Sequence, residues 1–289
     1  MTSKNTRPSP THAAKEKSRV SKDQWREFTK TVWSIANTTS PKHPAVFPIE
    51  IPERLIRLFT FVDEIVLDPF AGVGTTASAA VGLGRRAVCV EENRSYVAEI
   101  RRIASLSNDG NGHADTVRVI RGDCRNLDAL EDASISLVVT SPPYWNKASY
   151  GDGKANIGGI AQYTKFLREI RPAFAECYRV LQPGRKMCIV TANVNQFTDH
   201  GLLTFPLAAD FTVILREIGF VMINEVIWSK NGTGGKWGSS GAQRPIFGSY
   251  PYPPNFLFKN VHEYVLIFAK PPALPVKSPK ALSYKSLME

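Results

Sequence analysis

The chain has 289 residues, 43% of them hydrophobic, and a net charge of +10. This length can bury a full core, and no apolar run approaches the roughly 18 residues that would suggest a membrane-spanning helix. The start of the chain lacks the apolar stretch of a signal peptide, and the four cysteines form no C-x-x-C pair, which argues against a disulfide framework or a zinc site. We therefore expect a cytoplasmic protein without a structural metal.

The positive charge is concentrated at the two ends of the chain. Residues 1–42 hold nine Lys and Arg against three acidic residues, and residues 270–289 hold four Lys against Glu289. We expect a basic, partly disordered N-terminal arm over 1–40, because its first 20 residues are polar and have no apolar period, and a basic Pro-rich tail over 271–289. Such ends suit a polyanionic partner, although tails that only aid solubility are the alternative.

Between these ends, residues 41–270 alternate short apolar runs with amphipathic segments and are interpreted as one domain. Strands are predicted at 65–68, 87–91, 117–121, 137–140, 187–191, 221–228 and 263–269. Helices are predicted at 52–61, 75–83, 95–107, 163–181 and 205–218. This alternation indicates an α/β fold with a doubly wound, mostly parallel seven-stranded sheet. No helix separates the final two strands, so we expect the last one to run antiparallel.

The first predicted strand is followed by a glycine turn and a helix start, with the sequence Asp68-Pro69-Phe70-Ala71-Gly72-Val73-Gly74-Thr75-Thr76. The glycines permit close backbone approach, and the helix start offers free N–H groups. A nucleotide P-loop is excluded because no Lys-Ser/Thr follows the glycines. A dinucleotide site and an ordinary glycine turn stay open. Asp68 favours S-adenosyl-L-methionine (SAM), since its carboxylate can meet a cationic amino-acid group and would repel a pyrophosphate.

Two further carboxylates follow the next two strands. Glu91 or its neighbour Glu92 is placed to accept hydrogen bonds from ribose hydroxyls, and Asp123 from the adenine amino group, with a helix cap or turn as the alternative role of Asp123. The predicted cofactor residues are thus Asp68, Pro69, Phe70, Gly72, Gly74, Thr75, Thr76, Glu91 and Asp123.

A second motif, Thr140-Ser141-Pro142-Pro143-Tyr144-Trp145, directly follows a buried strand. Proline has no N–H to donate and fixes its own φ, so the carbonyls near this strand end are held rigidly outside a sheet ladder. An aromatic ring follows at once. This polar socket with a flat ring suits a planar ring that carries an amino group.

The two motifs together resemble those of the DNA amino-methyltransferases, which methylate N4 of cytosine or N6 of adenine with SAM. The resemblance runs from about Lys42 to Lys270: residues 68–76 look like the SAM motif, and Ser141-Pro142-Pro143-Tyr144 looks like the catalytic [D/N/S]-P-P-[Y/F/W] tetrapeptide. It implies a class I, Rossmann-like SAM-dependent methyltransferase that flips a base out of double-stranded DNA. The order of the motifs departs from the common permuted type, which puts the Pro-Pro motif first.

The resemblance also implies roles for individual residues. The Ser141 side chain and the Pro142 carbonyl would accept from the target amine, Pro143 completes the rigid strand end, and Tyr144 would stack on the flipped base. Cytosine C5 methylation is excluded, because no cysteine follows a proline. Serine at the first position, preceded by Thr140, looks more like the N4-cytosine enzymes, with N6-adenine as the alternative.

No large target-recognition domain is visible. We therefore expect a short target to be recognised by residues 146–159, by a recognition loop at 231–260 that is rich in Gly, Pro and aromatics, and by the basic arms, or else by a second subunit. The predicted DNA contacts are Trp145, Lys236, Trp237 and Arg244, with packing beneath the loop as the alternative for Trp145. The resemblance places the protein near the nucleoid, beside a cognate restriction endonuclease or as an orphan methylase, as a monomer or a homodimer. An RNA or protein amino-methyltransferase and a non-catalytic nucleic-acid binder stay open.

Overall fold

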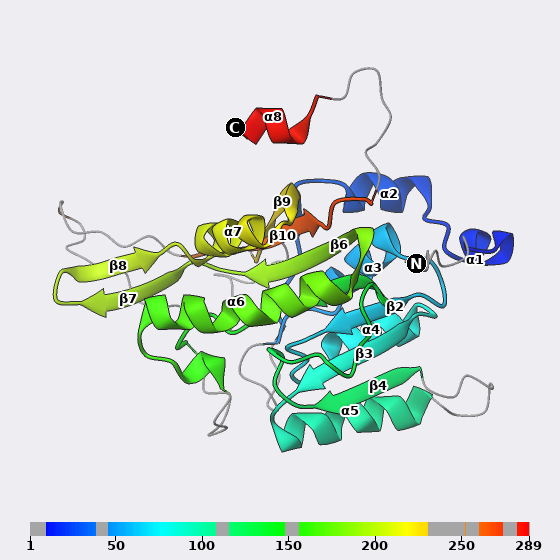
Figure 1. Cartoon of the computed structure of the whole chain (residues 1–289), viewed down its shortest axis with the longest axis horizontal. Helices are drawn as coiled ribbons and strands as arrows, with labels where there is room; N and C mark the ends of the chain where they lie inside the picture. Colours follow the sequence, from blue (N-terminus) through cyan, green and yellow to red (C-terminus); the bar gives the residue numbers. More distant parts are fainter. Residues whose placement is uncertain are drawn as a thin grey trace, which may run out of the picture.

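The computed structural model describes residues 10–38, 46–107, 116–147, 156–230, 252, 260–273 and 282–288. Within these ranges the core is an eight-stranded sheet with the order β1-β9-β10-β6-β5-β2-β3-β4 (Figure 1). Its strands are β1 (Val32–Ser34), β2 (Ile65–Asp68), β3 (Arg86–Glu91), β4 (Val117–Arg121), β5 (Ile135–Thr140), β6 (Leu181–Thr191), β9 (Val221–Ser229) and β10 (His262–Ala269).

β10 is the one strand of this described sheet that runs against its neighbours. It pairs antiparallel with β6 and with β9, and the remaining pairs of the sheet are parallel. The predicted α/β class and the antiparallel last strand are therefore confirmed. All seven predicted strands are present. Every residue of β5 is buried, as its continuous apolar run predicts, whereas most residues of β9 are partly or fully exposed.

The predicted number of strands was wrong by one. β1 pairs with β9 at the edge of the sheet, with Trp33 opposite Trp228. Trp33 is fully buried, whereas Val32 and Ser34 are exposed. A three-residue strand with one apolar anchor has too short a pattern to separate from a loop.

The described part of the N-terminal arm is folded, which corrects the expectation of disorder over residues 10–20. It contains α1 (His12–Lys17) and α2 (Lys22–Phe28), and a capping box between Ser21 and Gln24 starts α2. The Ser18 hydroxyl accepts a hydrogen bond of 2.7 Å from the backbone N–H of Val62, just before β2. Because parallel strands begin at the amino edge of their sheet, this bond anchors the arm there, opposite the strand ends that carry the motifs (Figure 1).

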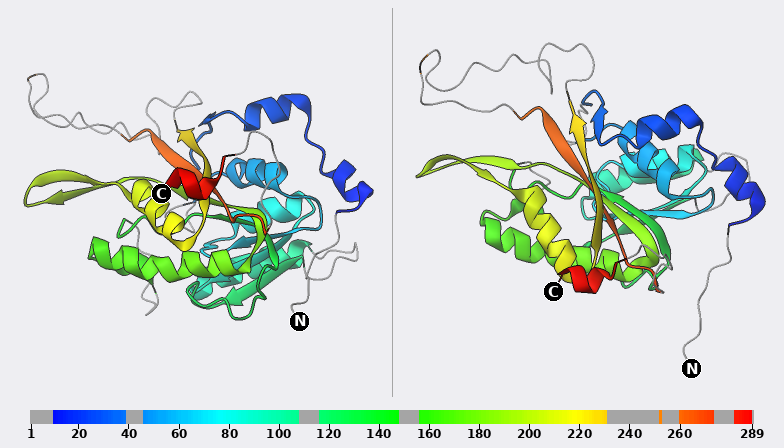
Figure 2. Two further views of the ribbon diagram at one scale, coloured as in Figure 1. Left: turned by 45° about the horizontal axis from the view of Figure 1, so that its top comes forward. Right: turned by 90° about the horizontal axis from the view of Figure 1, so that it is seen from above.

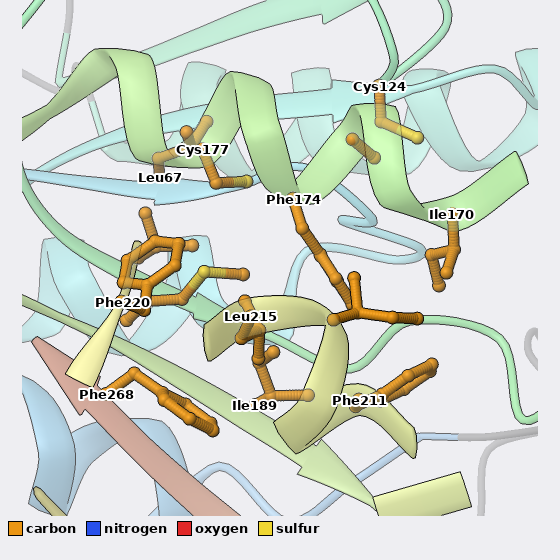
Figure 3. Packing of buried hydrophobic residues seen from close by; sticks show 14 of the residues in the cluster. Leu67, Cys124, Ile170, Phe174, Cys177, Ile189, Phe211, Leu215, Phe220 and Phe268 are labelled. Carbon is orange, nitrogen blue, oxygen red and sulfur yellow. The ribbon is translucent and has the colours of Figure 1, made fainter. Parts of the chain in front are cut away.

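Helices cover both faces of the sheet (Figure 2). One core contains residues of α3 (Glu50–Phe59), α4 (Thr75–Gly82) and α5 (Arg94–Ser107), and the other contains residues of α6 (Tyr163–Val180) and α7 (Leu207–Ile218). Figure 3 shows the second core, in which the Phe174 ring of α6 meets the Phe211 ring of α7 edge-on, with centroids 5.2 Å apart. The five helices match their predicted ranges to within three residues at each end. None of the helices in the described ranges has the length and apolarity to cross a membrane.

A hairpin, a 3-10 turn and a C-terminal helix also lie outside the predicted pattern. β7 (Val194–Thr198) and β8 (Gly201–Phe205) form an antiparallel hairpin between β6 and α7, and Figure 2 shows it projecting beyond the main sheet. A single 3-10 turn spans Ile157–Gly159, and α8 (Tyr284–Met288) lies within the basic tail. The hairpin places exposed Phe197 on its outer part, so it gains little from core packing and leaves a weak apolar signal.

Candidate active site

The carboxylate and hydroxyl side chains of the predicted site meet at the carboxyl edge of the sheet. β4, β3, β2 and β5 are adjacent and parallel, so their ends bring Asp123, Glu91, Asp68 and Ser141 to one side. β10 runs in the opposite direction, so its first residues, His262 and Glu263, lie at this same edge. The sheet thus unites motifs that are far apart in the sequence.

Asp68 links the two motifs from a buried position. Its carboxylate accepts from the Thr76 hydroxyl at 2.7 Å, the Thr140 hydroxyl at 2.6 Å and the Phe70 N–H at 3.1 Å. Its side chain is almost fully buried, and burial raises the pKa of Asp68 although these bonds act against it. The carboxylate here faces protein donors, and the predicted contact with a cationic cofactor group stays a prediction.

The glycine turn after β2 has the backbone that its sequence predicts. Gly72 and Gly74 both have positive φ angles, +50° and +88°, which residues with a Cβ rarely adopt. Gly74 is also the residue before α4 and provides no side-chain cap, so the first N–H groups of α4 have no side-chain acceptor from this position. A Cβ at Gly74 would lie 2.9 Å from Ile103, so this turn packs closely on α5. Phe70 and Thr75 are partly exposed beside it, whereas Pro69 and Thr76 are buried.

Glu91, at the end of β3, holds the glycine turn in place. One carboxylate oxygen accepts from the N–H of Gly72 and the other from the N–H of Asn93, both at 2.8 Å. Burial raises the pKa of Glu91, and the nearby charge of Asp68 adds to this effect. The two oxygens offer about four acceptor positions, so capacity remains for a hydroxyl group.

Asp123, after β4, is paired with its neighbour Arg125 through side-chain bonds of 2.7 to 3.0 Å, and it accepts from the Arg125 N–H at 2.9 Å. Partial burial acts to raise its pKa, but the hydrogen bonds and the charge of Arg125 outweigh this, and the pKa of Asp123 is lowered. Arg125 in turn pairs with Glu169 of α6. The turn role that the sequence left open for Asp123 is therefore present, and a contact with adenine stays a prediction.

Buried and partly exposed residues alternate in the second motif, which follows β5. Thr140, Pro142 and Pro143 are buried, while Ser141 and Tyr144 are partly exposed. The Ser141 hydroxyl donates to the Tyr144 hydroxyl at 3.3 Å. Of the three residues predicted to touch the target base, Ser141 and Tyr144 are thus partly accessible, whereas Pro142 is buried.

Glu263 and Lys230 extend this motif, and neither was among the predicted site residues. The Tyr144 hydroxyl donates to Glu263 at 2.8 Å, and the other Glu263 oxygen pairs with the Lys230 ammonium. In the sequence, Glu263 is only the first residue of the strand predicted at 263–269. No local pattern joins Glu263 to Tyr144, because they lie 119 positions apart.

Trp145 is part of the core in this structure. It is 5% exposed, and its ring lies 4.8 Å from Phe205 and 5.2 Å from Tyr163, between centroids. Its φ of +53° is unusual for a residue with a side chain, so the surrounding packing must hold it. The packing role that the sequence offered as an alternative is what the structure places here, and the surface contact with DNA is not supported by its burial.

The other three predicted DNA contacts, Lys236, Trp237 and Arg244, lie outside the described residues. Among the residues that the structure describes, no cluster of His, Cys, Asp and Glu has the arrangement of a metal site. All four cysteines are buried and unpaired, and burial raises the pKa of each thiol.

A profile of the family described as DNA methylase (N6_N4_Mtase) matches residues 2–102 and 135–287, which is most of the chain. The chain belongs to this DNA methylase family. The resemblance read from the SAM motif and the tetrapeptide is thereby confirmed, and the match extends into the N-terminal arm of this family member.

Individual members of the DNA methylase family align with part of this chain. Type II methyltransferase M.MjaI of Methanocaldococcus jannaschii is 29% identical over 191 residues, which is 58% of this chain and 60% of that protein. Type II methyltransferase M.BglI from Bacillus subtilis is 34% identical over 28% of this chain and 24% of that protein. The chain therefore spans less than two thirds of the length of these relatives.

Similarity in sequence extends to solved structures. One of them is a provisionally assigned DNA modification methylase of Thermus thermophilus in complex with SAM. It is 31% identical over 58% of this chain and 63% of that chain, with a TM-score of 0.39.

Proposed function

We propose that this chain transfers a methyl group from SAM to the exocyclic N4 amine of a cytosine in duplex DNA. The observation that carries the proposal is the hydrogen bond from Thr140 to Asp68, which fixes the Pro-Pro tetrapeptide beside the glycine turn. The two halves of a methyl-transfer site, one for the donor and one for the amine, are thereby held at one sheet edge.

The residues around the glycine turn fit SAM by the chemistry of their free groups. The uncapped N–H groups at the start of α4 suit the carboxylate of the methionine moiety, and the spare acceptor positions of Glu91 suit ribose hydroxyls. Bound SAM would supply an electrophilic methyl group on a sulfonium. Family membership and the motif that resembles the SAM motif of DNA amino-methyltransferases both support this cofactor.

The tetrapeptide residues would bind and orient the target amine. An exocyclic amine is a poor nucleophile because its lone pair is conjugated with the ring. The Ser141 hydroxyl and the Pro142 carbonyl accept its two N–H groups and favour a more tetrahedral nitrogen in the transition state. Positioning of reacting groups can contribute up to ~7–11 kcal/mol.

The target amine is engaged in base pairing, so the base must leave the duplex. Flipping costs a few kcal/mol, and stacking on the accessible Tyr144 ring would return ~1–3 kcal/mol. Contacts with the rest of the duplex would supply the remainder of this cost.

The choice of cytosine rests on Ser141 at the first position of the tetrapeptide. Resemblance to the N4-cytosine enzymes supports it, and N6-adenine is the second candidate because the same acceptors can receive either amine. The Type II names of the relatives support a cognate restriction endonuclease as the partner.

The test is incubation of the purified chain with PCR-amplified DNA, which carries no methyl groups, and SAM labelled in its methyl group. Mass spectrometry of the hydrolysed nucleosides should find labelled N4-methylcytosine. Labelled N6-methyladenine would overturn the choice of base, and label on matched RNA alone would overturn DNA as the substrate. Ser141→Ala should lose most of the activity. Ser136→Ala in the preceding strand should keep it, since the Ser136 hydroxyl is buried and has no partner among the described residues.

A further inference from the structure

The Tyr144 hydroxyl donates a hydrogen bond to Glu263, and Glu263 also forms an ion pair with Lys230. Glu263 and Lys230 lie on neighbouring antiparallel strand ends, where the Lys230 N–H donates to the Val261 carbonyl at 2.9 Å. The side chains of Lys230 and Glu263 are only 15% and 12% exposed. The Lys230 ammonium also lies 5.1 Å from the centre of the buried Trp228 ring. Such a pair is fixed from several sides and offers Tyr144 a defined acceptor.

The direction of this hydrogen-bond chain follows from the chemistry of its two last members. A lysine ammonium only donates, and an ionised carboxylate only accepts. The Tyr144 proton therefore points to Glu263, which leaves the phenol oxygen to accept from Ser141. With its own proton directed to Tyr144, the Ser141 oxygen presents lone pairs to any third group.

We propose that Glu263 is a positioning residue for methyl transfer. It orients the Tyr144 ring and, through the Tyr144 hydroxyl, makes Ser141 an acceptor rather than a donor towards the target amine. This inference rests on the proposed function, since it concerns the same amine. It assigns a role to a residue outside both sequence motifs.

The decisive variant is Glu263→Gln, which keeps the size of the side chain. In this variant the Lys230 ammonium donates to the amide oxygen, so the amide NH₂ faces Tyr144. The direction of the hydrogen bonds from residue 263 through Tyr144 to Ser141 then reverses. We expect a single-turnover methylation rate about tenfold lower on PCR-amplified DNA, in line with the usual value of a hydrogen bond to a charged group. The dissociation constant for SAM should stay within about twofold of the wild-type value, because no cofactor residue changes.

A double-mutant cycle separates this role from simple support of the fold. In a Tyr144→Phe background, Glu263→Gln should cause no further loss of rate, since the hydroxyl through which it acts is gone. Equal losses in both backgrounds, or a wild-type rate for Glu263→Gln alone, would overturn the proposal.

The matched control is Glu64→Gln. Glu64 is also a partly buried carboxylate, 15% exposed and paired with Arg185, but it lies before β2 at the amino edge. It should lower stability and leave the single-turnover rate unchanged, and a slower rate would mean that loss of a buried ion pair alone explains the result. Failure of the proposed function is distinguishable, because the wild-type chain itself would then transfer no label to DNA.

Discussion

The Thr140 hydroxyl at the end of β5 donates a 2.6 Å hydrogen bond to the Asp68 carboxylate at the end of β2, across 72 positions of sequence. Both groups are buried, and the Thr76 hydroxyl donates to the second oxygen of the same carboxylate. One carboxylate thus joins the tetrapeptide strand, the glycine turn and the first turn of α4.

Replacement of this hydroxyl tests the link between the two motifs. Thr140→Val keeps the shape of the side chain and leaves the buried Asp68 with one donor fewer. We expect the free energy of unfolding in urea to fall by about 1–3 kcal/mol. Ser136→Ala is the control, because the Ser136 hydroxyl on the same strand is buried without a partner among the described residues, and its loss should be near neutral. A Thr140→Val variant as stable as wild type would show that the bond contributes nothing.

The sequence predicts the positions of the motifs well because each motif is local. Strand, glycine turn and helix start follow one another within a few residues, and the parallel topology then brings the strand ends together. β6 is the instructive exception. It begins at Leu181, well before its predicted start, because Pro183 and Gly184 resemble a break but are accommodated where the pairing with β5 shifts register.

Contacts between distant residues could not be predicted in this way. Glu263 stands in a plain strand sequence. The predicted antiparallel course of the last strand places it at the carboxyl edge, but the order of the strands, which brings it near Tyr144, was not predicted. The same is true of Tyr163, whose hydroxyl donates to Asp210 at 2.5 Å and whose ring supports Trp145. Such pairs depend on the packing of helices and strands, which local pattern does not specify.

Substitution of Trp145 tests whether this residue packs in the core or contacts DNA. Trp145→Ala removes a ring that is 5% exposed, so we expect a loss of about 3–5 kcal/mol in the free energy of unfolding. Phe197→Ala is the comparison, because this hairpin residue is 74% exposed and should change stability little. If Trp145→Ala instead left stability intact and weakened DNA binding alone, measured by fluorescence anisotropy, the residue would be a surface contact.

The anchored N-terminal arm leads to a prediction about salt. Lys15, Lys17 and Arg19 lie close to Ser18, which binds the backbone before β2 at the amino edge of the sheet. Changing all three to Gln should leave the slope of log K against log salt for DNA binding unchanged. Lys147→Gln, shortly after Tyr144, should reduce that slope by about 0.9, the value for one phosphate contact. A reduced slope for the triple variant would place DNA against the arm.

The raised pKa of Glu91 predicts how stability depends on pH. Burial is the main cause, so between the unfolded value of 4.5 and the higher folded value the native state keeps a proton that the unfolded chain has released. Stability due to Glu91 is therefore present below this window and is lost as pH rises through it. Glu91→Gln cannot ionise, so its free energy of unfolding minus that of wild type should increase across the window and then level off.

Glu176 provides a control of opposite sign for this measurement. A hydrogen bond from Arg179 is the main cause of its lowered pKa, so its contribution is present above 4.5 and is lost as pH falls. The same difference for Glu176→Gln should therefore decrease as pH rises. Urea unfolding at several pH values between about 3 and 8 distinguishes the two trends, and a flat difference for Glu91→Gln would contradict a pKa raised by burial, since only a proton retained in the folded state can produce the rise.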